Sequence, residues 1–253
     1  MRTDKIVLLL ILLGLLQACS YVPVEPEVSN AEKASAVNVQ LGIGYLQQNN
    51  LVLASEKLTK ALSQDPESAP AHNAFAILQD RLLQTDKAEY HYKKATTLDP
   101  KNSQAANNYG AFLCRHGREL ESEKYFMQAL ENPLYGTPEF AYTNAALCLL
   151  QLGEEKETER AKEYLGKAIA AKSDFGPALL AMANLLFDEG QYASAKPYLD
   201  HYHLVARPTA RSLWLAIRNT LQLDGKGDVA ELAQRLVTDF PDSKEYQEWL
   251  AIQ

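Results

Sequence analysis

Small and large apolar residues recur every 34 positions in the first half of the chain, and this repeat limits the possible folds more than any single motif. The repeating sets are Gly42, Ala76 and Gly110; Ala54 and Ala88; Leu58, Tyr92 and Phe126; Ala61, Ala95 and Ala129; and Pro66 and Pro100. In each repeat, small residues would let two antiparallel helices approach closely, and a large apolar residue would fill the space beside them. Proline would end the second helix.

The pattern resembles the tetratricopeptide repeat (TPR), which has a period of about 34 residues. The interval lengthens between Ala129 and Ala168 and returns to 34 between Ala161 and Ala195. We expect "ENPLYGTPEF" to separate two repeats at this slip and "GEEKETER" to form a solvated turn inside the next. The prediction is an all-α superhelical solenoid of about six repeats, because open helix pairs must stack to bury their core. The predicted repeats are 35–68, 69–102, 103–138, 139–175, 176–209 and 210–243, with a capping helix at 244–253.

The amino-terminal segment predicts export and lipid attachment. Arg2 and Lys5 precede an apolar run that ends at Leu16, which is too short for an ordinary spanning helix and has the layout of a secretory signal. The run "LQAC" ending at Cys19 resembles the lipobox of bacterial lipoproteins, which implies cleavage after residue 18 and lipidation of Cys19. A chance cysteine after a signal peptide is the alternative. Ser20 resembles the residue that sorts such lipoproteins to the outer membrane.

The residues after Cys19 predict a spacer. Pro23 and Pro26 lie in a stretch without apolar periodicity, which is typical of an extended chain. We therefore expect a signal peptide at 1–18, a lipidated cysteine with a flexible tether at 19–34, and the repeats at 35–253. The expected location is the periplasmic face of the outer membrane, held by the lipid anchor.

The first helix of each repeat is expected to line a concave groove. The second, fifth, ninth and twelfth positions of these helices give an apolar strip in the first repeat and a mixture of apolar and polar residues, including amides, in the next two. The candidate partner-binding residues are Val39, Ile43, Leu46, Asn73, Ile77, Asp80 and Asn107. Such a groove would suit an amphipathic helix or an extended segment. The alternative is that the apolar strip only caps the amino-terminal core.

Two cysteines remain once Cys19 is lipidated. Cys114 and Cys148 lie on the first helices of consecutive repeats, and export would place them in an oxidising compartment. We expect a disulfide between them. Two buried free cysteines acting as small apolar residues are the alternative.

Residues that would support catalysis, metal binding or nucleic-acid binding are not grouped in the sequence. The five histidines are dispersed, and we find no phosphate-binding glycine loop or nucleophile motif. The formal charge is −7 with scattered basic residues, which argues against a nucleic-acid partner. We expect a monomeric protein that is not an enzyme and has no cofactor or metal.

Three segments carry a closer resemblance. "NNYGAFLCRHG", "FMQALENPLY" and "TPEFAYTNAALCLLQLG" resemble the PilF/PilW family of type IV pilus biogenesis and stability lipoproteins, the secretin pilotins. The resemblance covers essentially the whole chain. It implies that the protein binds pilus secretin subunits and promotes their localisation and multimer assembly in the outer membrane, which pilus biogenesis and twitching motility need. The family residues that carry over are Cys19, Cys114 and Cys148.

Two other functions remain open at this point. One is a TPR adaptor lipoprotein for outer-membrane barrel assembly or for regulation of murein hydrolases. The other is a periplasmic hydrolase, which would need a nucleophile, a base and an orienting group that the sequence does not reveal.

Overall fold

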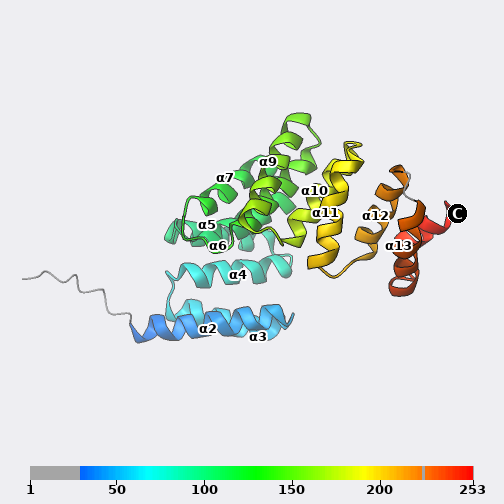
Figure 1. Ribbon diagram of the computed structural model, residues 1–253. Helices are drawn as coiled ribbons and strands as arrows, with labels where there is room; N and C mark the ends of the chain where they lie inside the picture. The colour runs from blue at the N-terminus through cyan, green and yellow to red at the C-terminus, as the bar shows by residue number, and fades with distance from the viewer. Residues whose placement is uncertain (1–28, 224–225, 253) are drawn as a thin grey trace, which may run out of the picture.

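The computed structural model describes residues 29–223 and 226–252, and all regular structure in these residues is helical. The helices form antiparallel pairs that follow one another along the molecule, with the amino-terminal pair and the carboxyl terminus at opposite ends (Figure 1). The predicted all-α TPR solenoid is confirmed. The pairs are α2 (Asn30–Gln47) and α3 (Leu51–Gln64), α4 (Ala69–Arg81) and α5 (Thr85–Leu98), α6 (Ser103–Arg115) and α7 (Glu119–Leu130), α8 (Pro138–Leu149) and α9 (Glu155–Ala171), α10 (Gly176–Asp188) and α11 (Tyr192–Val205), and α12 (Ala210–Gln222) and α13 (Lys226–Asp239), followed by α14 (Lys244–Leu250).

The residues of the 34-residue repeat form the core of the helix pairs. Leu58 is fully buried, and Tyr92 and Phe126 occupy the same place in the next two repeats. The small residues beside them are needed for close packing. A Cβ atom at Gly42 would lie 2.5 Å from Leu58 Cγ, and one at Gly110 would lie 2.8 Å from Phe126 Cε1. The periodic sequence therefore sets the distance between the two helices of each repeat.

Two glycines of α2 should respond oppositely to alanine. Gly42→Ala should lower the free energy of unfolding by about 1–3 kcal/mol, because the methyl group would overpack the buried Leu58. Gly44 has no atom within 4 Å of its Cβ position. Gly44→Ala should raise the free energy of unfolding by roughly 0.5–1 kcal/mol, because glycine weakens a helix interior. Urea denaturation followed by circular dichroism checks both variants, and equal stabilities would contradict this packing.

A left-handed residue makes the turn inside the first three repeats at the same interval. Asn49, Leu83 and Gly117 have φ angles of 56°, 58° and 72° and are 34 positions apart. The turn therefore needs this conformation whichever residue occupies it. Leu83 is unusual because its side chain makes this conformation unfavourable, and it is 87% exposed.

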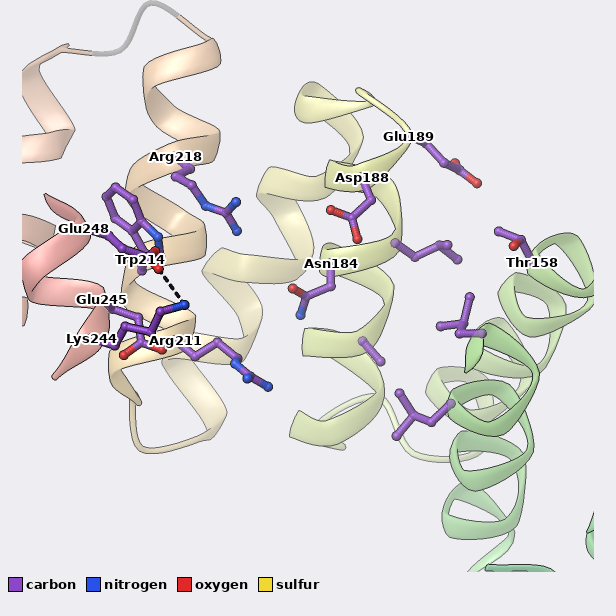
Figure 2. Close-up of a pocket in the computed structure, with 14 residues that line it drawn as sticks. Thr158, Asn184, Asp188, Glu189, Arg211, Trp214, Arg218, Lys244, Glu245 and Glu248 are labelled. Atoms are coloured by element: carbon purple, nitrogen blue, oxygen red, sulfur yellow. Dashed lines mark ion pairs between the residues drawn. The ribbon is translucent and has the colours of Figure 1, made fainter. Parts of the chain in front are cut away.

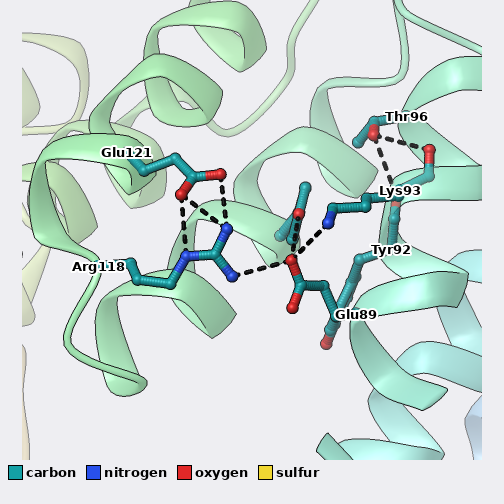
Figure 3. Close-up of polar contacts among 7 residues, drawn as sticks. Glu89, Tyr92, Lys93, Thr96, Arg118 and Glu121 are labelled. Carbon is teal, nitrogen blue, oxygen red and sulfur yellow. Dashed lines mark hydrogen bonds and ion pairs between the residues drawn. The ribbon is translucent and has the colours of Figure 1, made fainter. Parts of the chain in front are cut away.

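The repeats stack through their first helices and through polar contacts. Each first helix contacts the first helix of the next repeat, so α2, α4, α6, α8, α10 and α12 form one continuous layer. Arg118, before α7, links two repeats by pairing with Glu89 of α5 at 2.8 Å and with Glu121 at 2.6 Å (Figure 3). Hydrogen bonds from Lys93 and Arg118 hold the pKa of Glu89 at about 2. This carboxylate therefore stays charged and keeps the contact at neutral pH.

The structure corrects the boundary of the predicted tether. α2 begins at Asn30, so residues 30–34 are helical rather than part of a flexible spacer. Ser29 caps this helix, since its hydroxyl accepts from the Glu32 backbone amide while the Glu32 carboxylate accepts from the Ser29 amide. The spacing of Ser29 and Glu32 is the sequence signature of this capping box, and it places the start of the helix before residue 35. Cys19 and the signal segment lie outside the described residues. None of the helices in the described part of the chain is long and apolar enough to cross a membrane.

The predicted solvated turn at "GEEKETER" is also wrong, because most of it forms the start of α9. The extra residues of this repeat instead make a short 3₁₀ helix at Leu150–Leu152, which ends at Gly153 with φ of 68°. Glu155 and Glu157 lie in the first turn of α9, where the helix dipole favours negative charge. Arg160 of α9 pairs with Glu157 and with Glu123 of α7. The acidic stretch therefore joins two repeats.

Candidate functional site

The seven candidate groove residues divide into two classes. Ile43, Asn73, Ile77 and Asp80 are half-buried, so a partner can reach part of each side chain. Val39 and Leu46 are only 2% and 3% exposed and pack in the core between the first two repeats. Their assignment to an accessible groove was wrong for a physical reason: α4 covers this side of α2. The alternative, that they serve the amino-terminal core, describes these two residues.

Asn107 is the third buried member of the set. It is 5% exposed, and its Oδ1 atom accepts a hydrogen bond from Asn144 Nδ2 at 3.1 Å. A similar bond runs from Asn108 Nδ2 to Asn73 Oδ1 at 3.1 Å. The amides therefore join the first helices of consecutive repeats. Asn107 is a structural contact and not an exposed recognition group, which corrects its prediction.

A cleft of about 390 Å³ lies beside the accessible residues of the second and third repeats. We call it the N-terminal cleft; it is lined by Ile77, Asp80, Arg81, Tyr92, Asn108, Ala111 and Arg115. Asp80 pairs with Arg115 at 2.5 Å and lies 3.5 Å from His116 Nε2. Arg81 donates to the carbonyl oxygen of Leu46 at 2.5 Å. The cleft thus offers a small apolar surface bordered by charged groups, an arrangement suited to a polypeptide segment.

A larger pocket of about 680 Å³ lies between α8, α10, α12 and α14 (Figure 2). We call it the C-terminal pocket. Its apolar side chains are Leu147, Leu150, Ala181, Leu185 and Trp214, and its polar ones are Thr158, Asn184, Asp188, Glu189, Arg211, Arg218, Lys244, Glu245 and Glu248.

None of the residues of this pocket was among the predicted groove residues, although several lie at the same positions of their repeats. Leu147, Asn184 and Arg218 occupy the ninth position of the fourth, fifth and sixth predicted repeats. Arg211 and Trp214 occupy the second and fifth positions of the sixth. The predicted groove residues came only from the first three repeats. The sixth repeat has a weaker sequence pattern, so the pocket residues of α12 were not predicted.

The two cysteines expected to pair are bonded in the structure. Cys114 of α6 and Cys148 of α8 form a disulfide with their Cα atoms 5.8 Å apart. Cys148 is 1% exposed and Cys114 is 8% exposed. Both pack against Phe126 and Ala145 in one apolar cluster. The bond therefore joins the first helices of the third and fourth repeats, beside the point where the repeat interval slips.

Two histidines, buried His72 of α4 and half-buried His91 of α5, form a pair between these helices. His72 Nδ1 lies 2.8 Å from His91 Nδ1, and His72 Nε2 lies 3.0 Å from the carbonyl oxygen of Pro66. Since that carbonyl can only accept, His72 Nε2 carries a proton, and the neutral His72 accepts at Nδ1 from His91. Burial lowers the pKa of His72, and burial together with His72 lowers the pKa of His91 to about 4. Both rings are therefore neutral near pH 7.

Stability should fall as pH drops from about 6.5 to about 4 because of this pair. The unfolded chain binds protons at these histidines below a pKa of about 6.5, whereas the folded chain resists protonation, so acid favours unfolding. We expect a loss of about 1–2 kcal/mol between pH 6.5 and 4.5. His91→Gln should flatten this slope, while the loss below pH 4.5 that Glu89 contributes should persist. Urea denaturation at several pH values measures the free energy of unfolding as a function of pH. The same pH dependence in wild type and His91→Gln would refute its attribution to the histidine pair.

Groups of three or more His, Cys, Asp or Glu side chains placed to hold a metal ion are not found in the part of the chain that the structure describes. The histidine pair lacks a third ligand of this kind. Its geometry serves packing and hydrogen bonding between two helices.

Comparisons with known proteins agree in fold and in family. A family model described as tetratricopeptide repeat matches residues 91–124. The type IV pilus assembly protein PilF of Pseudomonas aeruginosa is 34% identical over 220 residues, which cover 87% of this chain and 86% of PilF. A solved structure of Pseudomonas aeruginosa PilF matches with a TM-score of 0.79 and 33% identity, covering 89% of this chain and all of that one. The structure of PilW, described as a widely conserved type IV pilus biogenesis factor, matches with a TM-score of 0.76 and 31% identity, covering 85% of this chain and 98% of that one.

Proposed function

Since the chain belongs to the PilF/PilW family of type IV pilus biogenesis proteins, we propose that it is a pilotin, an outer-membrane lipoprotein that binds the pilus secretin and promotes its localisation and multimer assembly. The observation that carries the proposal is the similarity to PilF along 87% of the chain, which is far more than one TPR motif would give. PilF is described as a type IV pilus assembly protein and PilW as a type IV pilus biogenesis factor, and the repeat matched in this chain is the TPR. Pilus biogenesis and twitching motility would then depend on the protein.

The N-terminal cleft is the proposed docking site for a secretin segment. Ile77 supplies an apolar contact, and Asp80 with Arg115 supplies a charged border. Ile43 and Asn73 extend the surface toward the first repeat. A rigid groove of this kind would cover an apolar segment of the secretin. Without this cover, the segment would associate with other exposed apolar surfaces. The secretin subunit would stay bound until it reaches the membrane.

A lipid on Cys19 is the proposed membrane anchor. The support is the lipobox sequence that ends at Cys19. Several acyl chains bind a membrane far more firmly than one, because each buried methylene contributes about 0.8 kcal/mol. Labelling cells with a palmitate analogue should tag the wild-type chain and not Cys19→Ser. An unlabelled wild-type protein would remove the anchor from the proposal.

Secretin multimers in the outer membrane give the direct test of function. A deletion strain should contain fewer multimers and more secretin monomer, and wild-type protein supplied in trans should restore them. The measurement is an immunoblot of separated outer membranes, together with a twitching assay. Undiminished multimers in the deletion strain would overturn the proposal and favour an adaptor role in barrel assembly or murein hydrolase regulation.

Variants of the N-terminal cleft test the docking site. Ala111→Gln should fill the cleft, and Ile77→Asn should remove its apolar contact, so each should weaken capture of the purified secretin by about tenfold or more. Leu120→Asn is the matched control, because Leu120 is 65% exposed on α7 outside the cleft. Circular dichroism verifies that the variants remain helical. Wild-type secretin capture by both folded variants would exclude this cleft.

A further inference from the structure

Two arginines in the C-terminal pocket have no anionic partner in the described part of the chain. Arg211 and Arg218 lie seven positions apart on α12, and both point from α12 into the pocket, toward Asn184 and Asp188 of α10 (Figure 2). Neither takes part in an ion pair or a side-chain hydrogen bond among these residues. Seven helical residues span about 10 Å, so the two charges are separated along one wall.

The guanidinium group of Arg218 is held in place by aromatic rings. Its central carbon lies 4.6 Å from the ring centre of Phe187 and 5.8 Å from that of Trp214. Its Nε atom is buried and has no hydrogen-bond partner. Cation–π stacking fixes the plane of the group but does not use its N–H donors. Because Nε is buried, a partner would reach Arg218 through its terminal Nη groups, which form no hydrogen bond with the described part of the chain.

The other charges of the pocket are largely neutralised by their own partners. Lys244 pairs with Glu248 at 2.9 Å, and Glu189 pairs with Lys162 at 2.6 Å. The lining acids without such a pair are Asp188, across the pocket on α10, and Glu245 on α14. The α12 wall thus presents two unpaired positive charges on either side of Trp214, and exposed apolar surface at Leu147 of α8 lines another part of the pocket.

We propose that the C-terminal pocket docks an extended acidic segment of a partner protein. In the polyproline II conformation, three residues span about 9 Å and return the side chain to the same side, so carboxylates at positions one and four of the segment would match Arg211 and Arg218. An apolar side chain between them would lie beside Trp214, which lines the pocket between the two arginines on α12, and the Asn184 amide faces the same space. A bilayer is too flat to reach these groups in a pocket between four helices. This second docking surface goes beyond the proposed function, because it shares no residue with the N-terminal cleft.

A labelled peptide tests the proposal directly. The probe is a fluorescein-labelled, amidated Gly-Asp-Leu-Phe-Asp-Gly peptide, added to the full chain in detergent and followed by fluorescence anisotropy. Replacing both aspartates by asparagine should weaken binding about tenfold or more, because a charge-assisted hydrogen bond is worth more than a neutral one. Raising the salt concentration from about 0.05 M to about 0.3 M should also weaken it.

Single substitutions distinguish this pocket from nonspecific attraction. Arg211→Gln should weaken peptide binding about tenfold, and since Arg211 is exposed the variant should fold. Arg207→Gln is the matched control, an exposed arginine outside the pocket, and should bind like wild type. Arg218→Lys should also weaken binding, because lysine lacks the planar fork. Asp188→Asn should tighten binding by removing an opposing negative charge.

The outcomes are separate from those of the secretin experiments. Equal binding of the aspartate and asparagine peptides would mean that the pocket is only apolar, and the proposal would fail. Wild-type affinity in Arg211→Gln, or no binding at about 1 mM peptide, would also overturn it. Secretin capture through the N-terminal cleft could persist in either case.

Discussion

Removing the disulfide between Cys114 and Cys148 should lower the free energy of unfolding by about 3–4 kcal/mol, because the bond closes a loop of about 34 residues in the unfolded chain. Alanine is the suitable replacement, since both positions are buried and a serine hydroxyl would be left in an apolar cluster. The double variant Cys114→Ala and Cys148→Ala should unfold at a lower urea concentration than wild type.

A reductant provides the matched control for the disulfide. Reducing the unfolded wild-type chain before refolding should bring its unfolding midpoint close to that of the double variant, whereas the double variant should not respond to the reductant. Mass spectrometry under denaturing conditions without reductant should find no free thiol at either position. Two free thiols, or a wild-type midpoint that does not change with reductant, would favour the alternative of unpaired buried cysteines.

Phe126→Ala should lower the free energy of unfolding by about 3–5 kcal/mol. Phe126 is fully buried and packs against Ala145, Cys114 and Cys148. Its truncation would leave a cavity at the contact between the third and fourth repeats. Leu120→Ala on the same helix is the control, and because Leu120 is 65% exposed its effect should stay within about 0.5 kcal/mol.

A double-mutant cycle with Gly110 tests whether Phe126 packs directly against that glycine. A Cβ atom at Gly110 would lie 2.8 Å from the Phe126 ring, so Gly110→Ala should cost about 1–3 kcal/mol in the wild-type chain. In the Phe126→Ala background the same change should be neutral or stabilise by about 0.5–1 kcal/mol, because the ring is gone and alanine favours a helix. Urea denaturation of the four proteins measures this coupling. Additive effects would contradict direct packing between the two residues.

The repeat positions were readable from the sequence because they obey a local rule. Ala54, Leu58 and Ala61 face the partner helix of their own repeat, and the turn between these helices is short. A period of 34 residues therefore identifies buried positions wherever it continues. The rule weakens where the chain adds residues, and "GEEKETER" was misread because helix-favouring acids at a helix start resemble a charged turn.

The accessible surface was harder to predict, because it depends on the next repeat. Val39, Ile43 and Leu46 share one face of α2, yet α4 covers the first and last of them and leaves Ile43 half-exposed. Asn107 has a polar side chain that could bind a partner, but Asn144, which is 37 positions away, donates a hydrogen bond to its Oδ1 atom. A helix pattern defines a face; it does not define how much of that face a neighbouring helix buries.

The sequence alone determined the helical repeat, the large and small residues of its core and the family to which the chain belongs. These follow from interactions within about one period of the chain, where spacing along the sequence fixes spacing in the fold. Only the tertiary structure decided which side chains remain accessible and which charges remain unpaired. Arg218 shows the physical reason: whether it finds an anion depends on α10 and α14, and their placement is set by packing between repeats.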